Sequence, residues 1–413
     1  MIQFERFTLS NGLKIIVHTD KSTSVVAFNL LYNVGARDEA PNRTGLAHLF
    51  EHLMFEGSEN IPQFDSPLLL AGGENNAFTS NDITNYYITI PSQNLETAFW
   101  LESDRMRGLV FSEEKLNLQK DVVIEEYKQS YLNQPYGDVW LMLRPLAYKV
   151  HPYRWPTIGS EVSHIRDVSL AEARAFYSKY YAPNNAILSV CGNVDAHEVL
   201  RLAEKWFGPI APSDIQSKNI PSEPVQDSFR LLEVKRDVPS DEIYITFHTG
   251  ARLDADYYPS DLMTDILSSG KSSRLYQHLV QEQKLFSDAN AYIMASMDPG
   301  LLVLSGRLMP ETKMEQAREA LWAEINQMKD LIVPDTELKK VTNKLVANNT
   351  YSEINVLNKA MNLGYYELLG DANVLNQLSE RYLAVGPQSI RDFAQNVCVE
   401  ENSSELHYYA EKA

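Results

Sequence analysis

The sequence predicts an α+β protein built from two similar units, in each of which helices pack on a mostly antiparallel sheet. Its 413 residues exceed the roughly 100–200 typical of one domain, so two domains or a duplicated unit are expected. Segments with the alternation typical of strands are separated by long helical segments. Two patterns also recur: an alternating strand ending in Gly-Ala-Arg, at 26–39 and 243–255, and a helix with an acidic first turn, at 111–126 and 333–348.

A segment rich in proline and serine lies near the middle of the chain, at 211–227, and lacks apolar periodicity. It is predicted to link an N-terminal unit, 1–210, to a homologous C-terminal unit, 228–413. The N-terminal unit starts on a strand–turn–strand pattern and continues through strands and helices in turn. Its clearest strands are expected at 85–91 and 186–194, and its clearest helices at 94–111 and 171–182.

Composition excludes several classes of function. The net charge of −18, without any basic stripe, argues against a nucleic-acid partner. The two cysteines, Cys191 and Cys398, are too few for a disulfide framework and are expected to be buried thiols. No segment approaches the ~18 apolar residues of a membrane span, and the N-terminus lacks the pattern of a signal peptide. A cytoplasmic bacterial enzyme is therefore expected, or a periplasmic one should an export signal have been removed.

The stretch "GLAHLFEHLMFEGS", 45–58, places three proton-active side chains in an apolar helical segment. His48 and His52 are four residues apart, so both rings can reach one point beside the helix, and Glu51 flanks that point. Catalytic zinc takes about three protein ligands and keeps one position open. Two imidazoles with an adjacent carboxylate as general base are the zinc-peptidase arrangement, here in the order His-x-x-Glu-His. The alternative is two ordinary core histidines with Glu51 at an exposed edge.

A third ligand is sought among the carboxylates of "QKDVVIEEYKQSYLNQPYG", 119–137. Glu126 follows Val122 by four residues and Val123 by three, so it is expected on their buried face, whereas Glu125 falls to the side. A carboxylate on a buried face costs several kcal/mol unless it is paired or bound to a metal. Glu126 is therefore the preferred ligand, and an ordinary solvated charge is its alternative.

These motifs together resemble the pitrilysin/insulinase family of inverted zinc metallopeptidases, which includes mitochondrial processing peptidase. "GARDE", the His-x-x-Glu-His stretch, "GGENNAFTSNDITNYY", the segment 119–137, "HPYRWPTIGS" and "YYAPNNAILSVCGNV" follow in family order, and "LSSGKSSRLYQHLV" is typical of the C-terminal unit. The resemblance implies a processing-peptidase-like fold of two homologous units. It implies His48, His52 and Glu126 as Zn²⁺ ligands and Glu51 as general base.

The resemblance also implies a peptide-binding edge strand in "GGENNAFTSNDITNYY", at Asn76, Ala77 and Phe78. An edge strand offers unpaired N–H and C=O groups that recognise an extended backbone whatever its side chains. The expected activity is endopeptidase cleavage of unfolded peptides or short polypeptides. The alternative for "GGENN" is a simple hairpin turn.

Two departures from the family pattern stand out. Gln119 occupies a position, seven residues before Glu126, where the family often has a supporting glutamate. In the second unit, Val280 and Ser287 stand where complete members carry an arginine and a tyrosine that bind substrate. The chain is therefore expected to be the metal-bearing subunit of a dimer, with a paralogous partner that supplies the pair or, alternatively, a second copy.

Two rival functions remain at this stage. The first is a non-catalytic structural subunit, like the family's core proteins in respiratory complexes, although such chains usually lose part of the His-x-x-Glu-His motif. The second is a chamber that binds peptides without cutting them. Nucleotide binding at "LSSGKSS", 267–273, is disfavoured because Asp265 stands where a phosphate-binding loop needs glycine.

Overall fold

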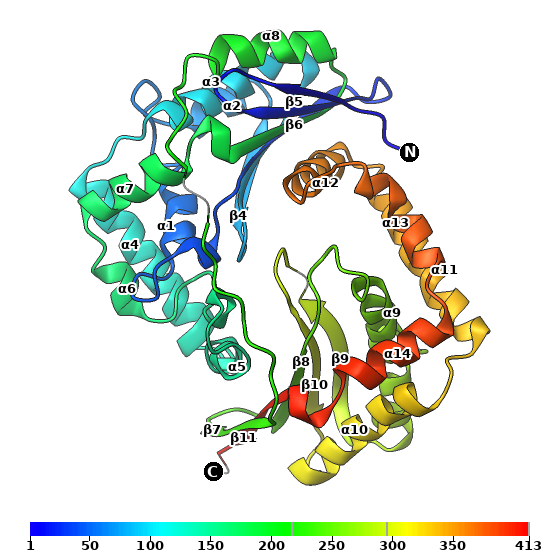
Figure 1. Cartoon of the computed structure of the whole chain (residues 1–413). Helices are drawn as coiled ribbons and strands as arrows, with labels where there is room; N and C mark the ends of the chain where they lie inside the picture. Colours follow the sequence, from blue (N-terminus) through cyan, green and yellow to red (C-terminus); the bar gives the residue numbers. More distant parts are fainter. Residues whose placement is uncertain (216–217, 295, 412–413) are drawn as a thin grey trace. The chain divides into compact units, whose positions relative to one another are not determined.

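The chain divides into two compact units, each assembled from three segments, and the computed structural model describes all residues except 216–217, 295 and 412–413 (Figure 1). Unit 1 comprises Met1–Gln129, Trp155–Pro221 and Thr350–Gln377, and unit 2 comprises Ser130–Arg154, Ser222–Asn349 and Leu378–Ala413. The chain passes from one unit to the other at Pro221–Ser222, inside the predicted linker. In contrast to the predicted continuous units, the segments 130–154 and 350–377 pack with the other unit.

Unit 1 contains a six-stranded sheet in the order β1-β2-β6-β3-β5-β4, in which only β2 and β6 pair in parallel. Its strands are β1 Glu5–Thr8, β2 Lys14–Thr19, β3 Val25–Tyr32, β4 Glu74–Thr79, β5 Thr84–Pro91 and β6 Ala186–Gly192. Its helices are α1 Leu46–Leu53, α2 Asp65–Leu70, α3 Leu95–Arg107, α4 Glu113–Tyr127, α6 Val162–Arg166, α7 Leu170–Tyr180, α8 Ala196–Trp206 and α12 Val356–Leu368. The strands predicted at 85–91 and 186–194 and the helices predicted at 94–111 and 171–182 are confirmed.

Helices cover both faces of this sheet, because β3 and β6 are buried along almost their whole length. Phe28 packs edge-on against Phe99 of α3, with ring centroids 4.9 Å apart. The next residue, Asn29, faces α12, where a Cβ on Gly364 would lie 2.8 Å from the Ser189 hydroxyl. Figure 1 accordingly shows α3 and α8 on one side of the sheet and α12 on the other. Apolar periodicity shows that a helix covers a sheet but not which sheet, so the sequence places 350–377 with its neighbours in the chain, whereas the structure places it in unit 1.

Unit 2 contains a five-stranded sheet in the order β7-β11-β8-β10-β9, in which only β7 and β11 pair in parallel. Its strands are β7 Arg230–Arg236, β8 Glu242–His248, β9 Phe286–Met294, β10 Leu301–Leu308 and β11 Ser403–Ala410. Its helical elements include α5 Val139–Ala147, α9 Tyr257–Ser268, η6 Leu275–Glu282, α10 Met314–Asp330 and α14 Pro387–Val397. Two further helices, α11 Asp335–Ser352 and α13 Val374–Leu383, lie where the chain passes between the units.

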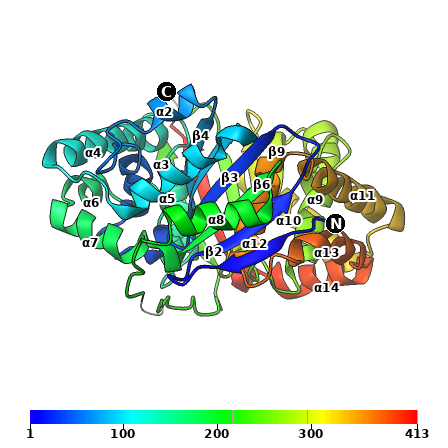
Figure 2. The same ribbon diagram turned by 90° about the horizontal axis from the view of Figure 1, so that it is seen from above.

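The two sheets have the same strand order once β1 is set aside, and in each the first pair is parallel and the others antiparallel. The repeated strand predicted at 26–39 and 243–255 corresponds to β3 and β8, which occupy equivalent places, and the repeated helix corresponds to α4 and α11. The predicted α+β fold of two similar units is therefore confirmed. Figure 2, seen from above, shows α8 lying over strands of the unit 1 sheet, which agrees with its contacts with β2. Across the described residues, every helix is either too short or too polar to cross a bilayer.

Candidate metal centre

Helix α1 carries the His-x-x-Glu-His motif, and its start is fixed by buried contacts. Gly45 precedes it with a φ of +90°, a left-handed conformation that favours glycine, and a Cβ there would lie 2.6 Å from the carbonyl oxygen of Ile158. The buried carboxylate of Glu39 accepts hydrogen bonds from the N–H groups of Gly45 and Ala47, both at 2.8 Å. Glu39 thus satisfies two N–H groups at the start of the metal-site helix.

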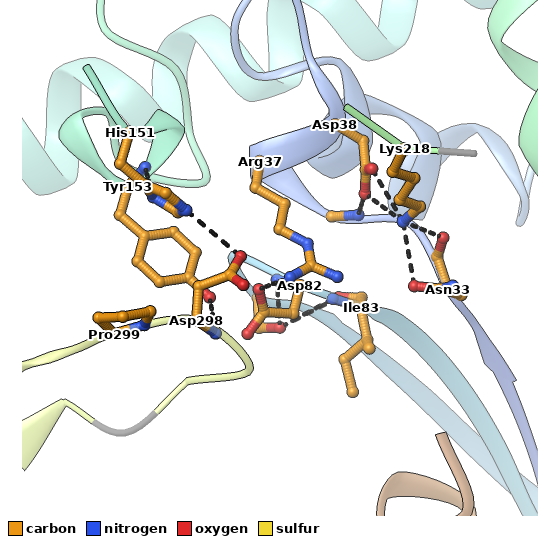
Figure 3. A network of polar contacts seen from close by, with 12 residues as sticks. Asn33, Arg37, Asp38, Asp82, Ile83, His151, Tyr153, Lys218, Asp298 and Pro299 are labelled. Atoms are coloured by element: carbon orange, nitrogen blue, oxygen red, sulfur yellow. Dashed lines mark hydrogen bonds and ion pairs between the residues drawn. The ribbon is translucent and has the colours of Figure 1, made fainter. Parts of the chain in front are cut away.

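The loop that presents Glu39 is anchored in turn by unit 1 (Figure 3). Lys218 donates to the Asn33 carbonyl at 2.7 Å and to the Asp38 carboxylate at 2.8 Å. Arg37 forms an ion pair with Asp82 at 3.3 Å, and both side chains are buried. The "GARDE" motif therefore holds helix α1 in place, a role that the sequence alone did not indicate.

The helix buries its apolar side and presents its polar side to α4. Leu46, Ala47, Leu49, Phe50 and Leu53 are buried. On the other side, ligand atoms of His48, His52 and Glu126 all lie within 4.8 Å of one another. The structure therefore brings together the three residues that the resemblance assigned as ligands, from two helices with 59 residues between them in the sequence, 54–112.

The spacing of these atoms fits a zinc ion. The Nε2 atoms of His48 and His52 lie 3.7 and 3.6 Å from Oε2 of Glu126, which is too long for a hydrogen bond. Ligand atoms about 2.1 Å from one zinc ion at tetrahedral angles lie roughly 3.4 Å apart. The Glu126 side chain is 43% exposed, so the cluster is accessible to solvent at this carboxylate. Two imidazoles and a carboxylate are also a donor set that zinc prefers.

The burial predicted for the third ligand is only partly correct. Val123 is buried, but Val122 is 43% exposed, so Glu126 lies at the edge of the buried face rather than on it. The preference for Glu126 over Glu125 stands on geometry, because Glu125 points to solvent and pairs with Lys128 at 2.5 Å. A helical repeat of 3.6 residues separates the two carboxylates by about 100°.

The charges of the three groups are coupled. Burial lowers the pKa of His48, whose Nδ1 atom is buried and has no hydrogen-bond partner among the described residues. The facing Glu126 carboxylate raises the pKa of His52, and His52 in turn lowers the pKa of Glu126. Without a metal, His52 and Glu126 therefore favour the charged pair, whereas His48 favours the neutral imidazole that a metal needs.

Glu51 lies beside the three ligands and is held by a residue that sequence reasoning missed. The Thr79 hydroxyl donates to Oε2 of Glu51 at 2.6 Å. Thr79 is the last residue of β4, and the alternation of this strand places its side chain on the same side as Asn75 and Ala77. The period-two pattern of 74–79 could have indicated the face, but not its contact with α1.

β4 is the edge strand of the unit 1 sheet, as expected for the predicted peptide-binding segment. Among the residues that the structure describes it pairs only with β5, so its other edge is open. Asn76 and Phe78 are exposed on one face and Ala77 is half-buried on the other. The N–H of Ala77 donates to the Asn76 side chain at 2.8 Å. The alternative of a simple hairpin turn is excluded for these three residues, because they lie within the strand.

The structure also shows the positions of the three residues that depart from the family pattern: Gln119, Val280 and Ser287. Gln119 lies on α4 and donates to Glu56 at 2.5 Å. In unit 2, Val280 lies on η6 and Ser287 is an exposed residue of β9 whose hydroxyl donates to the Arg307 carbonyl at 3.3 Å. The neighbouring Arg274 is bound to Glu337 through two hydrogen bonds, of 3.1 and 2.7 Å, which agrees with a packing role.

Comparison with known proteins agrees with the motifs. The family models "Insulinase (Peptidase family M16)" and "Peptidase M16 inactive domain" match residues 14–159 and 167–345. Zinc protease PqqE of Helicobacter pylori is 32% identical over 345 residues, which span 82% of this chain and 77% of that protein. The uncharacterized zinc protease YmxG of Bacillus subtilis is 24% identical over 404 residues, 96% of each chain.

Solved structures share the architecture. The crystal structure of a protease from Helicobacter pylori matches with a TM-score of 0.93 at 28% identity and covers 99% of this chain and 100% of that one. A putative M16-like peptidase from Alicyclobacillus acidocaldarius has the same fold, with a TM-score of 0.86 at 17% identity over 99% of each chain. From its sequence matches and its fold, this chain belongs to the insulinase family of peptidases, peptidase family M16.

Proposed function

We propose that this chain is a zinc-dependent endopeptidase that hydrolyses unfolded peptides or short polypeptides. The observation that carries the proposal is the spacing of His48, His52 and Glu126, which fits a tetrahedral zinc ion, with Glu51 immediately beside them. Relatives named zinc proteases support the same metal. A structural subunit would have no need of three ligand side chains at this spacing with a glutamate beside them.

His48, His52 and Glu126 would hold the zinc ion. When bound, zinc polarises a carbonyl group and acidifies water. Glu51 is the group of this chain that accepts the proton from the attacking water and returns it to the leaving amine nitrogen. Because Thr79 occupies Oε2 of Glu51, the other carboxylate oxygen is left for this proton.

The open edge of β4 is the proposed substrate-binding element. An extended peptide would add to Asn76, Ala77 and Phe78 as a further strand, through backbone hydrogen bonds that do not depend on its sequence. Thr79 ends this strand and contacts Glu51, so a peptide paired with β4 passes beside the base. Most of the backbone of a folded protein is already paired within its own structure, so the proposed substrate class is unfolded chains.

We also propose that a partner completes the enzyme. Val280 has no hydrogen-bonding side chain, and the Ser287 hydroxyl is too short to replace a phenol, so the arginine and tyrosine of complete family members have no equivalent at these positions. A paralogous subunit bearing that pair would form a heterodimer with this chain, and a homodimer is the alternative. Full peptidase activity of the chain purified alone would contradict the heterodimer.

The proposal is tested by metal analysis together with peptide cleavage. The purified chain should contain about one zinc per molecule, and it should cleave an unstructured peptide, with the proposed partner present, only when zinc is bound. Removal of zinc with a chelator should abolish cleavage, and added zinc should restore it. A chain that binds no zinc would favour the structural subunit, and a zinc-loaded chain that leaves peptide uncut after long incubation with the proposed partner would favour a peptide-binding chamber.

A further inference from the structure

The last residues of the motif "HPYRWPTIGS", 151–160, pack directly on the start of the metal-site helix α1. A Cβ on Gly45 would lie 2.6 Å from the carbonyl oxygen of Ile158, and a Cβ on Gly159 would lie 2.8 Å from the carbonyl oxygen of Thr44. Both glycines have a positive φ, of +90° and +100°. The two backbone segments therefore touch without side chains between them, a close approach that glycine permits.

Ser160, the final residue of the motif, joins helices α1 and α4 through its backbone. Its N–H donates to Oγ1 of Thr44 at 2.8 Å, and its carbonyl oxygen accepts from the Tyr127 hydroxyl at 2.9 Å. Thr44 lies just before α1 and four positions before His48, whereas Tyr127 is the last residue of α4 and directly follows Glu126. A continuous hydrogen-bonded link therefore runs from the end of α4 to the start of α1, and each of its ends lies close in sequence to a metal ligand.

The link is protected from water. Thr44 is fully buried and Tyr127 is 5% exposed. Oγ1 of Thr44 also lies 2.8 Å from Nδ1 of His164 on α6, so the hydroxyl is held on two sides. Breaking a buried hydrogen bond leaves a polar group without a partner, which costs more than exchanging an exposed bond for water. The link therefore resists movement of α4 away from the start of α1.

The opposite ends of the two helices are bonded as well. Lys115, near the start of α4, donates to the carbonyl oxygen of Glu56, just beyond the end of α1, at 2.5 Å. Helices α1 and α4 thus contact each other in antiparallel orientation, with a bond at each end of the metal cluster. Glu126 is the one proposed ligand on α4, so its distance from the two histidines depends on how far apart the helices lie. A metal site tolerates an error of only about 0.2 Å in each ligand distance.

We propose that Thr44, Ser160 and Tyr127 are positioning residues of the metal site. Their link sets the separation of α1 and α4 before the metal binds, so that zinc meets ligands already at the right spacing. Without the link, the metal-free chain samples a wider range of separations, and zinc binding has to order the helices at a cost in affinity. The inference rests on the proposed function only for the presence of the metal.

The test measures zinc affinity rather than activity, by competition with a chromophoric chelator on the full chain stripped of metal. Tyr127→Phe keeps the ring and removes the hydroxyl, and Thr44→Val keeps the shape and removes the acceptor, so each should weaken zinc binding about 3- to 10-fold. The double variant should bind no more than about twofold more weakly than the weaker single variant, because one break already opens a link in series. Thr44→Ser restores the acceptor and should bind zinc within about twofold of the unmodified chain.

A matched control, Tyr177→Phe, separates positioning from general stability. Tyr177 of α7 is buried, and its hydroxyl lies 2.6 and 2.9 Å from the carbonyl oxygens of Arg105 and Met106 at the end of α3. It therefore joins two helices of unit 1 that carry no proposed ligand. Tyr177→Phe should lower the midpoint of thermal unfolding of the metal-free chain by about 2–4 °C, as Tyr127→Phe should, but leave zinc affinity unchanged within about twofold.

The outcomes distinguish this inference from the proposed function. The inference is overturned if Tyr127→Phe binds zinc as tightly as the unmodified chain, or if Tyr177→Phe weakens zinc binding equally. It is also overturned if the effects of Thr44→Val and Tyr127→Phe multiply in the double variant, because the two bonds then act independently. If the unmodified chain binds zinc but cleaves no peptide, only the proposed function is overturned, since the zinc affinities still decide the role of the link. An unmodified chain that binds no zinc overturns both.

Discussion

Replacing Thr79 with valine removes the hydroxyl that orients the proposed general base and leaves the shape of the side chain almost unchanged. The bond to Oε2 of Glu51 is 2.6 Å long, which is typical of a hydroxyl bound to a carboxylate. Without it, Glu51 must be ordered anew in each turnover, and fixing a glutamate side chain costs up to about 1.5–2 kcal/mol. Since 1.36 kcal/mol corresponds to tenfold in rate, we expect kcat to fall about 10- to 30-fold.

The assay compares initial rates on an unstructured peptide, with the proposed partner present in excess and zinc content measured on the same samples. KM and zinc content should stay within about twofold, because the backbone of β4 and the three ligands are untouched. Thr79→Ser keeps the hydroxyl and should recover kcat to within about threefold of the unmodified enzyme. Asn75→Ala is the matched control, because Asn75 lies on the same face of β4 but donates to Asp65 at 2.8 Å. A valine variant with unchanged kcat, or a serine variant as slow as the valine variant, would refute the reasoning.

Three further predictions concern the metal and its base. Glu51→Gln should keep about one zinc per chain and lose at least about 100-fold in turnover, as initial rates and metal analysis would show; loss of zinc would contradict its assignment as the base. Glu126→Gln should weaken zinc retention against a chelator while Glu125→Gln does not, and equal affinities would move the third ligand. Zinc binding should release protons, chiefly from His52, because Glu126 raises the pKa of His52 while burial lowers that of His48. Zinc affinity should therefore rise with pH through the pKa of His52. Calorimetry in two buffers that differ in ionisation enthalpy counts the protons released on binding. A measurement that finds no proton released would be inconsistent with a charged His52.

Much of the candidate site could be predicted because its chemistry is local in sequence. His48, Glu51 and His52 occupy one helical turn and a half, and the 3.6-residue period is enough to place them on one side. Thr79 could not be found in this way, because its contact with Glu51 depends on how β4 lies against α1. Glu39 was likewise recognised only as part of a motif, and the structure shows why it is buried at the start of α1.

The same distinction between local sequence pattern and tertiary packing applies to the fold. Alternation of side chains is a local property, so the sequence by itself determined the strands at 85–91 and 186–194, the repeated strand in both halves, and the α+β class. Only the tertiary structure decided that α12 covers β3 and β6. Both faces of these strands are buried, and the sequence pattern of a strand does not say which helix of the chain packs on each face. The meeting of His48 and His52 with Glu126 was decided in the same way, since it depends on how α1 packs against α4. Periodicity fixes the direction in which a side chain points, and packing fixes what it meets.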